Sequence, residues 1–158
     1  MKNIDNSSIS IELVFNNKYN LISSLNSLDK AILTKVFWEN VFLSWIKIIG
    51  SEFSKYVPSA LINKKSFSLS FAIIDNKEIT GLNKEWMHKE GATDVLSFPM
   101  IDPKVAYDNL SFVELGDIFI SLDMVIKQSL EYNNGGGKTL VDYINSKFDP
   151  ENYLGKGK

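Results

Sequence analysis

The sequence contains no cysteine and no arginine, and it has a single histidine, His88. Without cysteine the chain forms no disulfides, and it has neither thiolate zinc ligands nor a cysteine nucleophile. With one histidine, a zinc site would take nearly all its protein ligands from carboxylates, which is unusual for zinc. The longest apolar run, Phe71 to Ile74, is far shorter than the roughly 20 residues that a membrane-spanning helix needs. The N-terminal residues lack the apolar stretch of a secretory signal, so we expect a cytoplasmic protein.

The charge balance gives no general attraction to polyanions. All 17 basic residues are lysines, and 19 acidic residues bring the net charge to -2. A nucleic-acid contact must therefore come from a local group of lysines. Hydrophobic residues make up 44% of the chain and charged residues 23%, which is ordinary for a globular protein and excludes wholesale disorder. A chain of 158 residues has room for one core.

The hydrophobic pattern changes repeatedly between a period of two, typical of strands, and spacings of three and four, typical of helices. Residues 75 and 78 form an aspartate–glutamate pair at capping-box spacing, which predicts a helix start. The expected strands are separated by helices, and one short strand is followed by a long loop over 101–113. This order predicts a small mixed sheet covered by helices. The expected strands are 9–15, 67–74, 94–98 and 117–120, and the expected helices are 29–49, 75–86, 121–130 and 138–148.

The C-terminal part of the chain differs in character from the rest. The run Gly135 to Gly137 has almost no conformational preference, so we expect residues 1–134 to form the domain, with its core from about residue 9. Residues 135–158 then form a glycine-led tail. A phosphate-binding loop at these glycines is disfavoured, because Tyr132 stands where that motif requires its first glycine and no strand leads in.

Two other kinds of chemistry have weak support. A nucleophilic triad would need His88 as its base, but His88 lies in a polar loop and no nucleophile-elbow pattern occurs. Carboxylates could serve acid–base work near the long loop, although a charged loop rim is the commoner reason for such residues. These carboxylates are Asp102, Asp108, Glu114 and Asp117.

The most informative stretch runs from residue 81 to residue 99. Lys84 and Lys89 could contact a phosphate backbone, and the hydroxyls of Thr93 and Ser97 could hydrogen-bond to it. The alternative is a helix and a strand that simply pack together, and composition alone favours that alternative. Its packing residues would be Leu82, Trp86, Val95, Leu96 and Phe98.

Three blocks of this sequence, with their order and spacing, resemble the YbeY family of bacterial rRNA maturation endoribonucleases. The long N-terminal region resembles the extended form of cyanobacterial members, and the likeness covers roughly residues 9 to 134. The second block is highly specific. The blocks are Leu82-Asn83-Lys84-Glu85-Trp86, Ala92-Thr93-Asp94-Val95-Leu96-Ser97-Phe98-Pro99 and Leu115-Gly116-Asp117-Ile118-Phe119-Ile120-Ser121.

The resemblance implies a single α+β, zincin-like domain that binds one zinc ion and cuts single-stranded RNA. It also implies a role in 16S rRNA 3′-end maturation and ribosome quality control, with the 16S rRNA and the ribosome as partners. The sequence itself predicts no membrane partner and does not determine the oligomeric state. The candidate RNA-binding residues are then Lys84, Lys89, Thr93, Asp94, Ser97 and Asp117.

The chain departs from the family at its metal site. Family members hold zinc with three histidines spaced H-x-x-x-H-x-x-x-x-x-H from the last long helix, whereas no histidine follows His88 here. Zinc is thus expected for the family, but this sequence supports no metal ligand, no identified catalytic residue and no metal-site helix. Met87 also stands where many members carry an arginine that is thought to engage RNA phosphate.

Three interpretations remain. The chain has lost metal and activity through frameshift, truncation or fusion, or it is a natural non-catalytic relative that binds ribosomal RNA or the ribosome. In the third, tail carboxylates such as Asp142, Asp149 and Glu151 hold a hard ion and keep nuclease activity. The first interpretation is the most economical.

Overall fold

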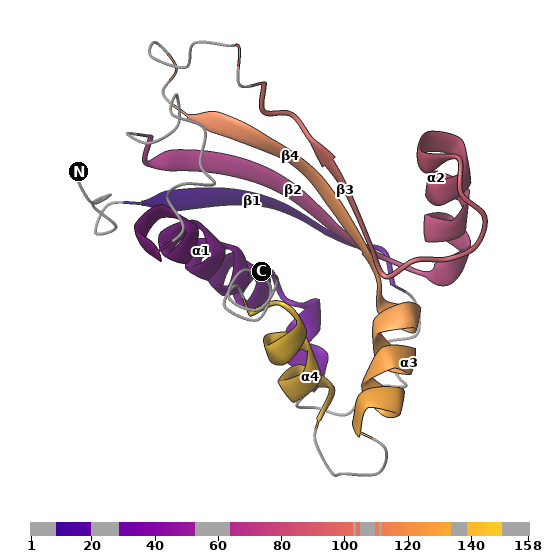
Figure 1. The fold of residues 1–158 in the computed structure, drawn as a ribbon. Coiled ribbons are helices and arrows are strands. Elements are labelled where there is room, and N and C mark those ends of the chain that lie inside the picture. Colours follow the sequence, from indigo (N-terminus) through magenta and orange to yellow (C-terminus); the bar gives the residue numbers. More distant parts are fainter. Residues whose placement is uncertain are drawn as a thin grey trace.

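The computed structural model describes residues 9–19, 29–52, 64–102, 104, 110, 112–133 and 139–149. The order of strands and helices along these residues is the one that the hydrophobic pattern predicts (Figure 1). The first elements are β1 (Ser10–Asn17), the 3-10 helix η3 (Asp29–Leu33), α1 (Lys35–Glu52) and β2 (Ser66–Ile74). The later ones are α2 (Asn76–Met87), β3 (Val95–Pro99), β4 (Val113–Ser121), α3 (Leu122–Asn133) and α4 (Leu140–Lys147).

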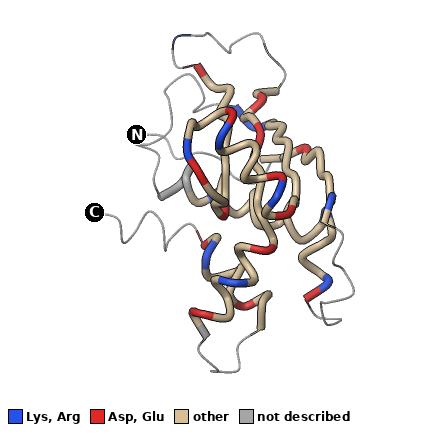
Figure 2. Tube along the Cα trace, turned by 90° about the vertical axis from the view of Figure 1, so that its right-hand side faces the viewer, with Lys and Arg blue, Asp and Glu red and all other residues tan. Residues whose placement is uncertain are grey.

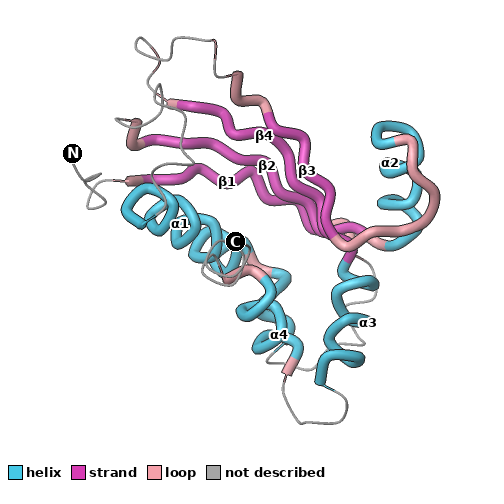
Figure 3. The backbone as a smooth tube through the Cα atoms, in the orientation of Figure 1, coloured by secondary structure: helices cyan, strands magenta, loops and turns pink. Residues whose placement is uncertain are grey.

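The sheet has the strand order β1-β2-β4-β3, so β1 and β3 are its edges (Figure 3). Strand β2 pairs in parallel with both β1 and β4, whereas β3 runs antiparallel to β4. The parallel pairs need helical crossovers, and the antiparallel pair is joined by the long connection that begins after residue 99. The predicted α+β fold with a mixed sheet and helical cover is confirmed.

Helix α1 lies along one face of the sheet, and α3 and α4 pack next to each other on the same side, where the larger part of the core lies (Figure 1). Trp38 of α1 is fully buried at this face, and its ring centroid lies 4.5 Å from that of Phe71 on β2. Phe42 and Phe148 pack around the same tryptophan at 6.0 and 5.4 Å. Four aromatic side chains that bury large apolar areas therefore form the centre of this layer.

Helix α2 packs against one end of the opposite face. There Ala72 and Ile74 of β2, Ile79 of α2 and Leu96 of β3 form a second cluster. Along β2, half-buried serines at 66, 68 and 70 alternate with buried apolar residues, and from Phe71 onward every residue is buried. The second half of this strand is therefore covered on both faces.

Strand β4 is longer than the sequence predicts, because Gly116 lies inside the strand instead of introducing it. The pairing register with β2 shifts here, from Ser68–Glu114 to Ser70–Asp117, which marks a β-bulge. Gly116 has φ +128°, and a β-carbon at this position would collide with the carbonyl oxygen of Phe98. Glycine is needed at this bulge for both its backbone angle and the close approach of β3.

The predicted helix over 29–49 divides at Thr34. Its hydroxyl donates a 2.7 Å hydrogen bond to the carbonyl oxygen of Ala31 and accepts one of 3.4 Å from the backbone N–H of Phe37. The 3-10 helix η3 precedes this residue and α1 follows it. Threonine favours such helix starts because its hydroxyl satisfies N–H groups that the first turn leaves unpaired.

Helix α4, in the predicted tail segment, packs into the main core. Thr139 and Asp142 form a capping box at its start, while Leu140 and Ile144 are buried. The indole N–H of Trp45 donates a 2.6 Å hydrogen bond to the carbonyl oxygen of Phe148 at its other end. The described part of the tail therefore contributes Leu140 and Ile144 to the main core, next to α3 and η3. The glycine run and residues 150–158 lie outside the described residues.

Candidate RNA-binding site

The first family block forms the C-terminal half of α2, and its asparagine fixes the loop that follows. Asp75 begins the helix as predicted, since its carboxylate accepts a 2.9 Å hydrogen bond from the N–H of Glu78. At the other end the carbonyl oxygen of Asn83 accepts hydrogen bonds from the backbone N–H groups of His88 and Lys89. The side-chain amide of Asn83 donates a 3.0 Å bond to the carbonyl oxygen of Gly91. Because Asn83 is 5% exposed, these bonds hold the 88–91 loop against the helix from inside.

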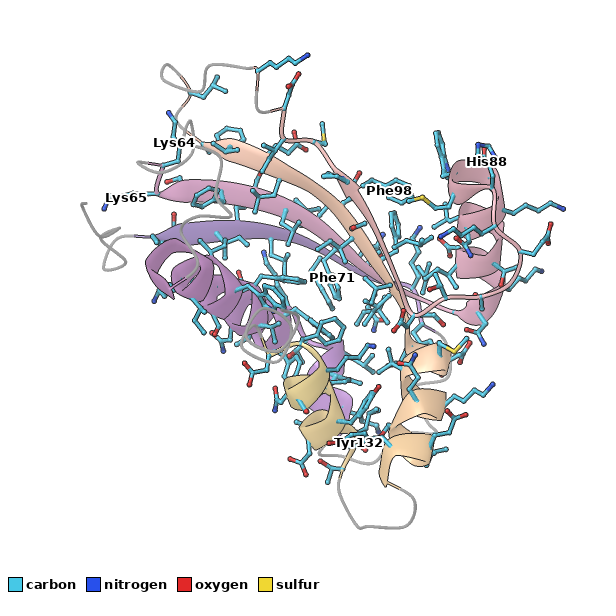
Figure 4. The ribbon with its side chains drawn as sticks, in the orientation of Figure 1. Lys64, Lys65, Phe71, His88, Phe98 and Tyr132 are labelled. Atoms are coloured by element: carbon cyan, nitrogen blue, oxygen red, sulfur yellow. The ribbon has the colours of Figure 1, made fainter. Side chains whose placement is uncertain are left out.

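The two candidate phosphate-binding lysines are both exposed, Lys84 on α2 and Lys89 in the loop. His88, between the two lysines in sequence, adopts the left-handed region at φ 56°, lies at the end of α2 and is exposed (Figure 4). Glu85 and Glu90 are exposed beside them, so this stretch of α2 and its loop carries balanced charge. Its electrostatic attraction to phosphate is correspondingly small.

Asp94 of the second block binds other parts of the protein. Its carboxylate accepts hydrogen bonds from the ammonium of Lys147 on α4 at 2.6 Å and from the amide of Gln128 on α3 at 3.2 Å. The backbone N–H of Val95 donates a third, at 2.8 Å. Burial alone would raise the pKa of Asp94, but the hydrogen bond and charge of Lys147, with the other two bonds, lower it. In this structure Asp94 joins β3 to α3 and α4, and Thr93 adds a 3.4 Å contact to the same carboxylate.

Ser97 and Asp117 line a pocket of about 440 Å³ beside the β3 edge of the sheet. Ser97 pairs with Ile118, which contacts the α1 layer, whereas Asp117 pairs with Phe98, which packs in the α2 layer. Their side chains therefore belong to opposite faces of the sheet. The remaining wall of the pocket is mostly apolar and is formed by residues of α1, β1, β2, β4 and the end of α4, including Phe42, Trp45, Leu69, Leu115 and Phe148.

The six predicted residues thus do not form one cluster. Lys84 and Lys89 lie with α2, Thr93 and Asp94 lie at the start of β3, and Ser97 and Asp117 lie at the pocket.

Sequence reasoning placed Trp86 on the packing side of α2. The structure leaves it 61% exposed in the last turn, in edge-to-face contact with Phe98. The available signal for this exposure was the position of Trp86 in the last turn of the helix, one residue before α2 ends at Met87.

The zinc centre implied by the resemblance does not fit the side chains that the structure describes. Among these residues no group of three histidine, cysteine, aspartate or glutamate side chains could hold a metal ion. His88 is at the end of α2, and Asp142 of α4 is engaged in the capping box. Glu151 lies outside the described residues. Three neutral imidazoles, the donor set that suits a catalytic zinc, are lacking in a chain with one histidine.

The chain is similar to proteins named Endoribonuclease YbeY over most of its length. The family model of that description matches residues 33–144. The protein of that name from Prochlorococcus marinus strain MIT 9515 is 46% identical over 140 residues, which is 87% of this chain and 78% of the relative. That of strain MIT 9215 is 48% identical over 131 residues, or 81% and 73%.

A solution structure of a Thermotoga maritima protein is also similar, with a TM-score of 0.41 and 18% identity over 85% of this chain and 67% of that one. Within the described residues, none of the helices combines the length and apolar character that crossing a membrane requires.

The family model covers well over half of the chain and includes α2, β3, β4 and most of α4. The chain belongs to the Endoribonuclease YbeY family.

Proposed function

We propose that this chain binds unpaired 16S ribosomal RNA near its 3′ end, in the cytoplasm, and that its 158 residues do not cleave that RNA. Membership in the family supports the RNA substrate class. The resemblance of the three sequence blocks supports the ribosomal target. One observation supports the loss of cleavage. The chain has a single histidine, which lies at the end of α2, so it lacks the three-imidazole donor set of a catalytic zinc.

The carboxylates near α4 have structural partners. Asp94 is paired with Lys147 at 2.6 Å, and Asp142 accepts the backbone N–H of Thr139 at 3.2 Å. A metal ion would have to displace a lysine from the first and a helix cap from the second. We therefore assign no catalytic step to these groups.

The first experiment measures metal and cleavage on the 158-residue chain. After incubation with zinc and gel filtration, bound metal is determined by atomic absorption, and a single-stranded RNA with the 16S 3′-end sequence is incubated with the protein. We expect substoichiometric zinc and no cleavage above that of a heat-denatured control. Stoichiometric zinc with cleavage that a chelator stops would contradict the proposal.

A second experiment measures binding of the same RNA by fluorescence anisotropy across a salt series. Each phosphate contact with single-stranded nucleic acid contributes about 0.7 to the slope of log affinity against log salt. Replacing Lys84 and Lys89 with alanine should weaken binding and reduce the slope by about 1.4. The matched control replaces Lys30 and Lys35, which are exposed on η3 and α1, and should leave the slope unchanged.

The outcomes separate the two remaining interpretations. Salt-sensitive affinity without cleavage supports a non-catalytic RNA-binding relative. A folded chain with no affinity for single-stranded RNA would instead indicate that function was lost together with the metal ligands. An equal effect of the two lysine pairs would remove the 84–89 region as the phosphate contact.

A further inference from the structure

Trp86 is unusual among the tryptophans of this chain because much of it faces solvent. Trp38 is completely buried in the aromatic core, and Trp45 is partly buried with its indole N–H bonded to a backbone carbonyl. Trp86 is 61% exposed. An isolated exposed apolar residue needs no explanation, but a large aromatic ring held rigidly at the surface is a typical contact residue of a binding site.

The position of Trp86 follows from the geometry of α2. Trp86 follows Ile79 by seven residues and Asn83 by three, so it lies on the helix face that packs against the sheet. Met87 at the end of α2 packs against the second cluster, whereas Trp86, one residue earlier, is exposed at the rim of that contact. The helix ends directly after it, and the hydrogen bonds of Asn83 fix the following loop.

Aromatic contacts hold the ring from the sheet side. The centroid of Trp86 lies 6.3 Å from that of Phe98, with an interplanar angle of 76°, and Phe98 contacts Phe119 in the same manner at 5.8 Å and 81°. Phe98 lies on the side of the sheet that faces α2 (Figure 4). A ring supported from one side by a rigid strand is ordered before any ligand binds, so stacking on it costs little conformational entropy.

The charges around Trp86 favour a ligand that binds through stacking more than through charge. Lysines and acidic residues are interspersed along the described chain, with no arginine to give a bidentate phosphate contact (Figure 2). Next to Trp86, Lys84 and Lys89 are balanced by Glu85 and Glu90. A polyanion held here must gain most of its affinity from a term that does not depend on charge, and base–aromatic stacking is such a term.

We propose that Trp86 is a stacking platform for one unpaired base of single-stranded RNA, with Lys89 in the adjoining loop contacting a neighbouring phosphate. This inference rests on the proposed RNA-binding function and names a residue that would contact the RNA. A protein partner could also use an exposed tryptophan, but membership in a family of endoribonucleases favours RNA. Because every base presents an aromatic face, the platform is indifferent to sequence and rejects duplexes, whose bases are already stacked.

The test compares Trp86→Leu and Trp86→Phe with the wild-type chain. Leucine retains apolar contact with Phe98 but has no aromatic face, whereas phenylalanine retains that face. Tyr132→Leu is the matched control, since Tyr132 on α3 is 59% exposed and also rests on another ring, that of Tyr143. Urea denaturation of each variant establishes that the fold is intact.

Affinity is measured with two probes of equal length and charge, a 12-residue oligouridylate and its abasic counterpart. For oligouridylate, we expect Trp86→Leu to weaken binding by about 5- to 150-fold, the range measured for loss of one stacked base. Trp86→Phe should lose less, Tyr132→Leu should lose nothing, and the salt slope should stay unchanged in all three. The abasic probe should not distinguish Trp86→Leu from wild type.

Three results would overturn the proposal. If the wild-type chain binds oligouridylate and Trp86→Leu binds it equally well, the proposed RNA-binding function stands and the platform is wrong. If Trp86→Leu weakens both probes equally, the residue acts through the fold or through phosphate contacts. If the wild-type chain binds neither probe, the proposed function and the platform both fail.

Discussion

Replacing Lys147 with methionine should destabilise the protein by about 2 kcal/mol at pH 7. The ammonium of Lys147 lies 2.6 Å from the carboxylate of Asp94, and the two side chains are 12% and 26% exposed. Removal of one partner of a fully buried pair costs about 3–5 kcal/mol, and an exposed pair contributes about 0.2–1 kcal/mol. A value between the two ranges applies, because both side chains are partly exposed and Asp94 keeps the hydrogen bonds of Val95 and Gln128. Methionine retains most of the apolar stem of lysine.

The effect should disappear in acid. Folding lowers the pKa of Asp94, so the ionised carboxylate stabilises the folded chain above its unfolded-state pKa of about 3.9. That stabilisation is lost as the pH falls through the lower folded-state pKa. The free energies of unfolding of the wild type and Lys147→Met should therefore differ fully at pH 7 and converge as the pH falls below the lowered pKa of Asp94.

Urea denaturation followed by the fluorescence of the buried Trp38 measures both values. The control is Lys18→Met, which removes the exposed pair of Lys18 with Glu78, whose charged atoms lie 3.4 Å apart, and should cost less than about 0.5 kcal/mol. A double-mutant cycle with Asp94→Asn isolates the coupling between the two partners. The reasoning is refuted if Lys147→Met costs no more than Lys18→Met, or if its cost does not fall as the pH is lowered from 7 into the acid range.

Three further predictions concern stability and are checked by urea denaturation. Gly116→Ala should cost at least about 2 kcal/mol, because φ is +128° and the new β-carbon meets backbone, whereas Gly91→Ala meets open space and should cost about 1 kcal/mol; equal costs would contradict this account of the bulge. Ile144→Ala should cost about 2–5 kcal/mol if α4 is part of the core, against less than about 0.5 kcal/mol for the exposed Asn145→Ala; similar small losses would show that α4 is dispensable. Thr139→Ala should cost about 1 kcal/mol through loss of the capping box, and an unchanged urea midpoint would exclude that role.

The local structure of this protein could be predicted because its signals lie within a few residues of each other. The alternation in β2, the cap at Asp75 and the helical spacing of α3 depend on neighbouring positions, and the structure confirms each. The motif blocks were also local, and the comparisons confirm the family to which they point. Thr34 shows the limit of such signals, because an apolar pattern continuous across residue 34 gave no sign that a helix start interrupts it.

The arrangement of the candidate site depended on contacts between distant segments. The insertion of β4 between β2 and β3, and the bulge at Gly116, follow from which faces of the strands become buried. Asp94 lies among the predicted RNA-binding residues in sequence, yet its carboxylate is held by Lys147, 53 positions away. Trp86 has the spacing of a buried residue, but the folded chain leaves it 61% exposed. The sequence by itself therefore determined most of the elements and the family, since these are matters of local pattern. Only the tertiary structure decided which of the predicted residues are available to a ligand, because burial and partners are properties of the packed chain.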